Sequence, residues 1–128
     1  MNPTGLHRWL PRLILAAAAA HLAVGAVESA PHWRDMLAEG LWNTVANDDA
    51  PRMTALWFMF SGVALVGLGL LARRSVLATG ALPVEIGWLL LLSGVPVALL
   101  EPVSGGWALL ALGALAVYAT RRSAPDRA

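Results

Sequence analysis

The sequence predicts an all-α fold: an integral membrane four-helix up-down bundle with a short amphipathic helix in the first outer loop. Three observations predict it. The 128-residue chain is 58% hydrophobic and 13% charged, whereas ordinary globular domains are about 45–50% apolar and about 25% charged. Four apolar segments of nearly membrane-crossing length occupy most of the chain. Finally, most of the basic residues lie at the two ends of the chain and in the gap between the second and third segments, whereas the other two gaps hold few.

The basic residues are all arginines, and their placement predicts an orientation. Seven of them lie at the N-terminus, between the second and third apolar segments, and at the C-terminus: Arg8, Arg12, Arg73, Arg74, Arg121, Arg122 and Arg127. The other two gaps hold Arg34 and Arg52, together with most of the carboxylates. Because cytoplasmic connections retain Lys and Arg, we expect a multi-pass protein of the cell inner membrane with both termini in the cytoplasm.

The chain is predicted to form a single four-span domain, residues 1–128. The predicted spans are residues 9–27, 53–72, 82–100 and 106–120. Pro11 falls in the first turn of the first span and Pro83 in the first turn of the third, where proline is tolerated, and Pro96 is expected to kink the third span. The first span is interpreted as an uncleaved helix, since Glu28 lies at an unfavourable position in the candidate signal-peptide cleavage site.

The first outer loop, residues 28–52, carries an apolar repeat at steps of three or four residues. Its members are Trp33, Met36, Leu37, Leu41 and Val45. That spacing predicts a short amphipathic helix in the membrane interface or over the end of the bundle, beginning at Pro31 and weakened by Gly40. Residues 47–51 are expected to form a turn into the second span, and residues 73–81 the short inner loop.

The predicted orientation brings polar residues from four segments to one depth, in the outer half of the bilayer. They are His21, Glu28, Trp57, Ser61, Glu101, Ser104 and Trp107. An ionisable residue inside a span indicates a functional site by default, because the bilayer makes it costly. His21 is therefore the candidate general acid or base, with Glu28 or Glu101 orienting it, and these three are the candidate catalytic residues. The candidate ligand-binding residues are Trp57, Ser61, Ser104 and Trp107.

Each of these residues also has a structural interpretation. His21 can be a neutral imidazole that bonds across helices to a hydroxyl or a carbonyl. Glu101 can face water at a helix end, Ser104 can cap the last helix, and the tryptophans can belong to the aromatic belts of the membrane interface. Glu85, at the inner edge of the third span, can pair with Arg73 or Arg74 and stays outside the candidate site.

Several kinds of site and partner are not expected. The histidines His7, His21 and His32 lie on different segments without the spacing that places two ligands on one helix face, so no metal site is predicted. No cofactor motif is present, and no basic patch with interleaved aromatics indicates a nucleic-acid partner. The expected partners are the lipid bilayer and an apolar small molecule. Oligomeric state stays open, because faces of small residues can pack within one bundle or between bundles.

The stretch Glu101-Pro102-Val103-Ser104-Gly105-Gly106-Trp107 resembles a turn found before the last span of small four-span bacterial membrane proteins of uncharacterised function. This family is broadly similar to DoxX-like proteins. The similarity extends to the His21-x-x-x-Gly25 step, to Gly40-Leu41-Trp42-Asn43-Thr44, and to Trp57-Phe58 followed by Gly62. Gly106 stands where a bulkier aromatic residue is expected. The resemblance implies the four-span fold and names no activity.

Two classes of function follow. The first is a binding or accessory protein for an apolar ligand or partner in the outer half of the bilayer. The alternative is a membrane-embedded enzyme (an isomerase, cyclase or oxidoreductase) acting on an isoprenoid, sterol-like or quinone substrate. In that alternative His21 and a carboxylate transfer a proton, and Trp57 and Trp107 line an apolar pocket. A small multidrug exporter also fits four spans, but it is expected to carry a carboxylate where this chain has His21.

Overall fold

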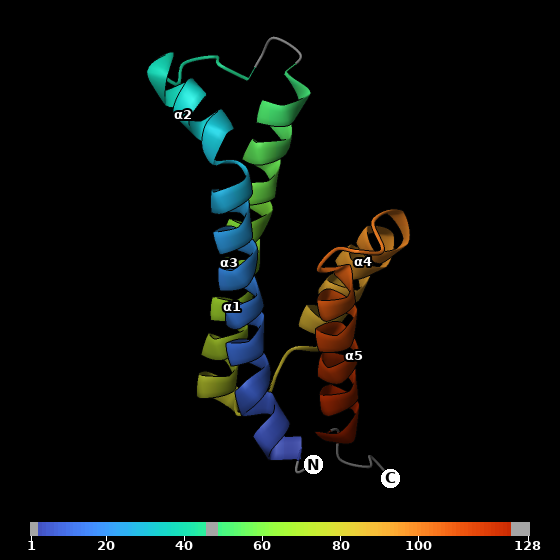
Figure 1. The fold of residues 1–128 in the computed structure, drawn as a ribbon. Coiled ribbons are helices and arrows are strands. Elements are labelled where there is room, and N and C mark those ends of the chain that lie inside the picture. Colours follow the sequence, from blue (N-terminus) through green and yellow to red (C-terminus); the bar gives the residue numbers. More distant parts are fainter. Residues whose placement is uncertain (1–2, 46–48, 124–128) are drawn as a thin grey trace.

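A computed structural model describes residues 3–45 and 49–123, and the regular structure in these ranges is entirely α-helical. The helices are α1 (Pro3–Glu28), α2 (Ala30–Ala38), α3 (Ala50–Thr79), α4 (Val84–Leu100) and α5 (Gly106–Ser123). α1 and α3 form one long antiparallel pair, and α4 and α5 form a shorter hairpin beside it (Figure 1). The start of α1 and the end of α5 lie at the same end of the molecule, opposite α2. We call the half that contains these two ends the terminal half, and the opposite half the α2 half.

The hydrophobic core lies in the terminal half, where the two helix pairs meet. Its members are Leu6, Leu10, Ile14, Ala72, Leu82, Ile86, Leu90, Leu112, Ala116 and Ala119. They come from the first half of α1, the second half of α3, the connection before α4, the first half of α4, and the middle and second half of α5. The two pairs are therefore joined at one end of the bundle.

α1 begins at Pro3, six residues earlier than the predicted first span. His7 therefore lies inside the helix, and Pro11 lies further along it than predicted. His7 is buried, and its Nδ1 accepts a hydrogen bond from the Leu82 backbone amide at 3.2 Å, which ties α1 to the start of α4. Pro11 lies inside the helix rather than in its first turn. Since proline has no N–H to bond the carbonyl four residues earlier, the interior position costs one helical hydrogen bond.

The predicted inner loop at residues 73–81 is also wrong, because α3 continues through both arginines to Thr79. The helix ends at Gly80, which adopts the left-handed conformation (φ 73°) and donates its amide to the Val76 carbonyl at 2.9 Å. Arginine is a good helix former. The arginine pair marks a change of polarity along α3 and not the end of the helix.

The predicted amphipathic helix exists as α2, but it is shorter than the apolar repeat suggested. Pro31 lies in its first turn, as expected, and Met36 is buried whereas Leu37 is exposed. The helix ends before Gly40 (φ 91°), and Leu41 also has a positive φ of 65°, so the repeat beyond residue 38 is not helical. Residues 47 and 48 of the predicted turn lie outside the described residues.

Arg52 holds the connection between α2 and α3 together. Its guanidinium donates to both carboxylate oxygens of Glu39, at 2.6 and 2.7 Å, and to the Thr44 carbonyl at 3.0 Å. Asp49 caps α3 by accepting from the Arg52 amide at 3.1 Å, and its second oxygen lies 3.1 Å from Nε of the same residue. The hydrogen bonds from Arg52 lower the pKa of Glu39. This role of Arg52 was not predicted from the sequence.

Small residues bring the helices together, more closely in the hairpin than in the long pair. A Cβ atom on Gly87 would lie 2.9 Å from the Val117 backbone nitrogen, and one on Gly106 would lie 2.6 Å from the Ala98 nitrogen. In the long pair, a Cβ on Gly62 would meet side chains, the nearest at 2.5 Å. The α4–α5 hairpin is thus packed backbone to backbone.

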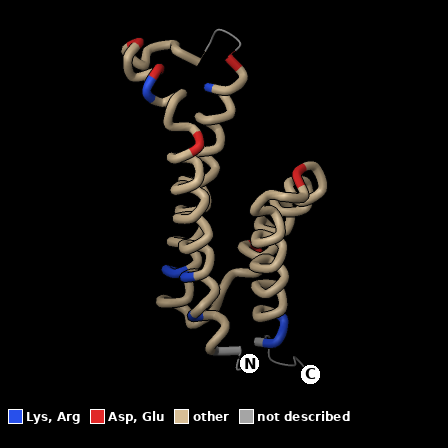
Figure 2. The backbone as a smooth tube through the Cα atoms, in the orientation of Figure 1, with Lys and Arg blue, Asp and Glu red and all other residues tan. Residues whose placement is uncertain are grey.

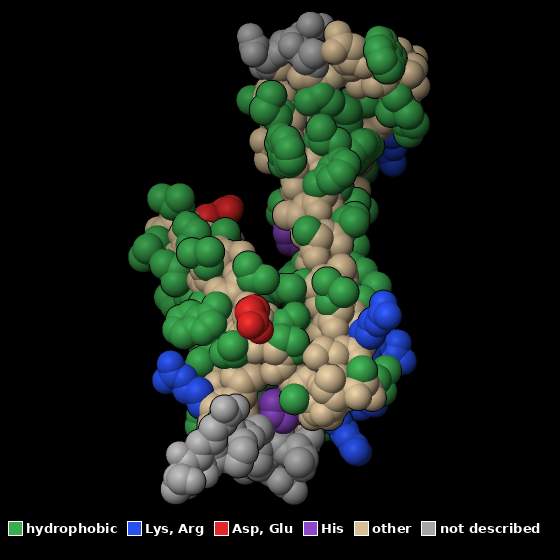
Figure 3. All heavy atoms as spheres, turned by 180° about the vertical axis from the view of Figure 1, so that it is seen from behind, with side chains coloured by type: hydrophobic (Ala, Val, Ile, Leu, Met, Phe, Trp, Pro, Cys, Tyr) green, Lys and Arg blue, Asp and Glu red, His purple; other side chains and the backbone are tan. Residues whose placement is uncertain are grey.

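Length and composition support two of the four predicted spans. The segments Gly5–Glu28 and Ala50–Thr79 are long and apolar enough to cross a membrane, and α4 is a shorter apolar helix of 17 residues. Large apolar side chains cover much of the visible surface (Figure 3). Such a surface is unusual for a soluble monomer.

The charges are distributed as the sequence predicted. Arginines gather toward the terminal half, and most of the acidic residues lie toward the α2 half (Figure 2). Glu85 is exposed in the first turn of α4, where a carboxylate is favoured by the helix dipole. Within the described ranges it forms no ion pair with Arg73 or Arg74.

Candidate functional site

One face of α1 is buried in the terminal half and uncovered in the α2 half. Residues at helical spacing along this face are Leu10, Ile14, Ala17, His21 and Val24. Leu10 and Ile14 are 0% exposed because they lie in the core, whereas Val24 is 47% exposed. The same face therefore loses its cover about halfway along the helix, close to His21.

α4 and α3 repeat this pattern. On α4, Leu90 is 1% exposed in the core, and two turns further the same face carries Val97, which is 39% exposed. Ser93 lies between them and is exposed. On α3, the face that joins the core at Ala72 continues toward α2 through Ser61, which lines an open groove.

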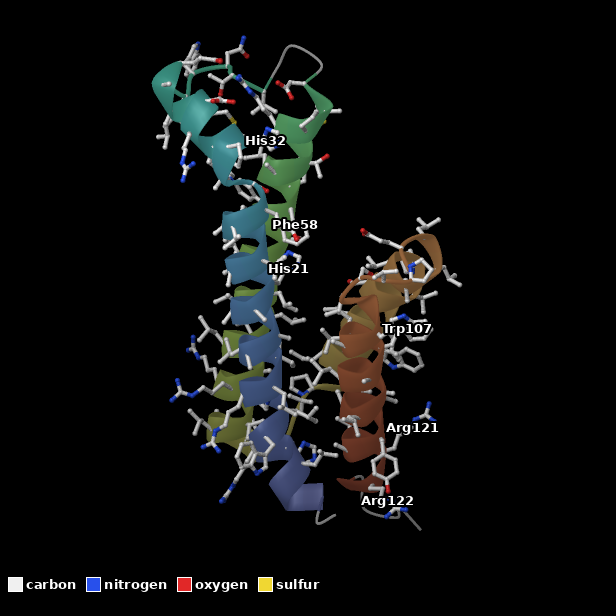
Figure 4. All side chains as sticks on the ribbon, viewed as in Figure 1. His21, His32, Phe58, Trp107, Arg121 and Arg122 are labelled. Carbon is white, nitrogen blue, oxygen red and sulfur yellow. The ribbon has the colours of Figure 1, made fainter. Side chains whose placement is uncertain are left out.

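These uncovered faces border one space between the long pair and the hairpin, which we call the notch. We define it by the residues that continue the core-facing side of each helix beyond the core, which are Ala17, His21 and Val24 of α1, Phe58 and Ser61 of α3, and Ser93 and Val97 of α4. The space-filling view shows the notch as an opening that separates the two pairs above the core (Figure 3). His21 and Phe58 lie on the side of the long pair that faces the hairpin (Figure 4).

His21 is held by three contacts with α3. Its Nε2 lies 2.9 Å from the Phe58 carbonyl oxygen and 3.1 Å from Ser61 Oγ. Its ring stacks on the Phe58 ring, with centroids 3.9 Å apart and planes within 9° of parallel. Close approach at this level is possible because Gly62 carries no side chain, and a Cβ there would lie 2.9 Å from the His21 ring.

The Phe58 carbonyl decides which nitrogen of His21 carries hydrogen. A carbonyl oxygen only accepts, so Nε2 must donate to it. Ser61 donates its own hydroxyl hydrogen to the same carbonyl at 2.7 Å, and this leaves its oxygen to accept from Nε2. In the neutral ring Nδ1 then bears a lone pair. Within the described part of the chain, no hydrogen bond is made to Nδ1.

The predicted carboxylate partners of His21 do not bond to it. Glu28 is the last residue of α1, seven residues and about two turns beyond His21. Glu101 follows the last residue of α4. Among the residues that the structure describes, neither forms a hydrogen bond or ion pair with His21. A catalytic role of His21, Glu28 and Glu101 stays a prediction.

The predicted ligand-binding residues fall into two separate places. Trp57 and Ser61 line a groove along α3, together with Phe58, Met53, Thr54 and Ala50. Ser104 and Trp107 lie on the hairpin, where they stabilise the α4–α5 turn. Ser104 Oγ accepts from the Gly106 amide at 3.2 Å, which confirms its predicted capping contact, and the Trp107 indole donates to the Pro102 carbonyl at 2.9 Å. Trp107 lies on the side of α5 away from His21 (Figure 4).

Phe58, Ser93 and Val97 were not among the residues predicted for the candidate site. The helical repeat through Leu90 could have indicated Ser93 and Val97, since they continue the same face. For Phe58 the signal was weaker, because aromatic residues are common along membrane helices. Among the described residues, no group of three His, Asp or Glu side chains could hold a metal ion.

Comparison with known proteins places the chain in one family. A family of unknown function, DUF6463, matches residues 5–123. No curated protein and no solved structure matches the chain significantly. The match agrees with an uncharacterised small family and does not support the resemblance to DoxX-like proteins. Because it covers most of the chain, the protein belongs to this family of unknown function, DUF6463.

Proposed function

We propose that all four long helices cross the bilayer, with both termini in the cytoplasm and α2 at the outer interface. α4, with 17 residues, is about 26 Å long at 1.5 Å per residue, close to the roughly 30 Å hydrocarbon thickness. The gathering of arginines in the terminal half supports this orientation. In a bilayer the exposed apolar side chains would contact lipid.

A labelling experiment tests this topology, since the chain has no cysteine. Single cysteines would replace Val103, which is 99% exposed in the α4–α5 turn, and Ala78, which is exposed near the end of α3. In intact cells a membrane-impermeant maleimide should label the cysteine at 103, and the one at 78 only after permeabilisation. Equal labelling of both in intact cells would overturn the proposed orientation.

We further propose that the notch binds an apolar molecule, so that the protein is a binding or accessory protein for an apolar ligand in the outer half of the bilayer. The observation that carries this proposal is the loss of cover along α1: a face fully buried at Ile14 is open at Val24. The polar contact of His21 lies at that boundary. An apolar recess with a few placed polar groups is the usual form of a small-molecule site.

A binding role is better supported than catalysis. Proton transfer by His21 needs a second group to orient or exchange the proton, and the described carboxylates do not bond to it. Nε2 is already engaged by a backbone carbonyl and a hydroxyl. These contacts suit a residue that positions a ligand.

The test is to purify the protein from its native membrane and identify co-purifying molecules by mass spectrometry. Val24→Trp would fill the notch, and Val63→Trp is its matched control, since Val63 is exposed on a different face of α3. We expect an apolar compound with the wild type and Val63→Trp that is lost from Val24→Trp and reduced in His21→Ala. Ordinary phospholipids in equal amounts from all four proteins would overturn the proposal.

A further inference from the structure

The polar groups of the notch are almost all hydrogen-bond acceptors. Ser61 donates its hydroxyl hydrogen to the Phe58 carbonyl at 2.7 Å, and Ser93 donates to the Leu89 carbonyl at 2.8 Å. Thr54, further along the α3 groove, donates to the Ala50 carbonyl at 2.8 Å. Each of these hydroxyls has therefore used its hydrogen within its own helix, and only oxygen lone pairs remain for other partners.

His21 completes this set of acceptors. Its Nε2 hydrogen is directed to Phe58, so the neutral ring offers only the Nδ1 lone pair to a ligand. The imidazole cannot turn its donor toward the notch without losing the carbonyl contact at 2.9 Å and the stack on Phe58 at 3.9 Å. The α3 backbone thereby presets His21 as an acceptor.

One donor side chain lines the adjoining groove within the described residues. Trp57 carries an indole N–H, and it lies one turn from Ser61 toward α2. A hydroxyl group of a ligand can donate to the Nδ1 lone pair, and its oxygen still accepts from a donor. A carbonyl or ether oxygen accepts only, so it would leave Nδ1 without a partner in an apolar recess, which is unfavourable.

We propose that the ligand of the notch is a neutral amphiphile with a hydroxyl group, and that this hydroxyl donates a hydrogen bond to Nδ1 of His21. The inference rests on the proposed binding function. Within it, the inference selects long-chain alcohols, isoprenoid alcohols, sterols or quinols over quinones, ethers and esters. The apolar walls at Ala17, Val24 and Val97 exclude a charged head group at this level, since no described side chain there offers an opposite charge.

The test compares two probes with the same alkyl chain, 1-hexadecanol and its methyl ether, of which only the alcohol can donate a hydrogen bond. Each would be added to the purified protein in lipid nanodiscs, and the retained amount measured. A net hydrogen bond contributes about 0.5–1.5 kcal/mol, so we expect the wild type to retain the alcohol roughly two- to tenfold better than the ether.

Two variants test whether His21 causes the preference for the alcohol over the ether. His21→Gln places an amide donor near the Nε2 position, which keeps the Phe58 contact, and removes the acceptor at Nδ1. We expect its alcohol-to-ether ratio to fall to about one. His32→Gln, on α2, changes a histidine outside the notch in the same way and should keep the wild-type ratio.

A spectroscopic measurement on the unmodified protein covers the case in which His21→Gln fails to fold. The ¹⁵N resonances of the His21 ring should show a protonated Nε2 and an unprotonated Nδ1, and the Nδ1 resonance should shift with the alcohol but not with the ether. A ring protonated at Nδ1 in the empty neutral protein would overturn the inference.

The outcomes separate this inference from the function on which it rests. If both probes are retained equally and Val24→Trp abolishes both, the notch binds apolar molecules and the hydroxyl inference is wrong. If neither probe is retained above the level of empty nanodiscs, the hydroxyl inference and the proposed binding function both fail.

Discussion

The terminal half and the α2 half are built from the same helix faces but differ in what covers them. In the terminal half, Leu10 and Ile14 pack against residues of α4 and α5 in one core. In the α2 half, Val24 continues the same face of α1 and is half exposed. Apolar spacing along a helix thus identifies a face, but the neighbouring element decides whether that face is buried in the core or left open.

Helix length explains only part of the loss of cover. α3 has 30 residues and α4 has 17, so α3 is about 45 Å long and α4 about 26 Å at 1.5 Å per residue. α3 ends at the short connection that begins with Gly80, and α4 starts after it. The hairpin therefore ends before the long pair does, and this leaves the α2 end of the long pair without cover (Figure 1). At the level of His21 the hairpin is present but stands apart from the long pair (Figure 4).

The largest difference between the halves is expected for leucines of α4. Leu90→Ala should destabilise the protein by about 2–5 kcal/mol, because it opens a cavity in the core. Leu92 is 74% exposed on the same helix, and Leu92→Ala should change stability by less than about 0.5 kcal/mol. Reversible unfolding in detergent micelles measures both. Similar losses for the two variants would contradict a core confined to the buried face.

A smaller effect is expected at His7, the polar contact of the terminal half. His7→Ala leaves the buried Leu82 amide without its acceptor and should cost about 1–3 kcal/mol. His7→Asn can place an oxygen near the Nδ1 position and should recover part of that loss. The same unfolding assay measures the stability of both His7 variants. If alanine and asparagine are equivalent, packing of the ring and not the hydrogen bond is what matters.

The smallest effect concerns the α2 half, at the exposed pair of Glu39 and Arg52. Hydrogen bonding to Arg52 lowers the pKa of Glu39 in the folded protein below its ordinary value of 4.5. The stabilisation is therefore complete above that value and is lost as the pH falls through the lower folded pKa. A spin label on a cysteine at Trp42, which is 92% exposed, should become more mobile over that acidic range.

Glu39→Gln supplies the control for this pH effect. It removes the titrating group, so the label should be mobile at neutral pH and show little change on acidification. Glu28→Gln alters a carboxylate outside the Arg52 cluster and should keep the wild-type profile. A profile unaffected by Glu39→Gln would show that another group orders the loop.

Much of the secondary structure was predictable from the sequence alone. Long apolar runs and an arginine-rich pattern indicated four long helices, an all-α fold and the separation of charges between the two ends. These features depend on local composition, which is why they could be recognised without a structure. Helix ends were less predictable: α3 continues past Arg73 and Arg74 because arginine favours helix, and α1 extends back beyond His7.

The candidate site was predictable only in part. His21 was recognisable as an ionisable residue within an apolar helix, and a bond to a carbonyl or hydroxyl was one of its expected interpretations. Its stack on Phe58 and its separation from Trp107 depend on how the two helix pairs meet. The burial of His7 also depends on how the two helix pairs meet.

What the sequence by itself determined is therefore the set of helices, their apolar faces and the sign of charge at each end, because these follow from residue type and spacing along one chain. Only the tertiary structure decided which faces are covered, where His21 finds its partners, and that Arg52 organises the loop. Those features depend on distances between segments far apart in sequence. Such distances are set by the relative lengths of the helices and by the close glycine contacts between them.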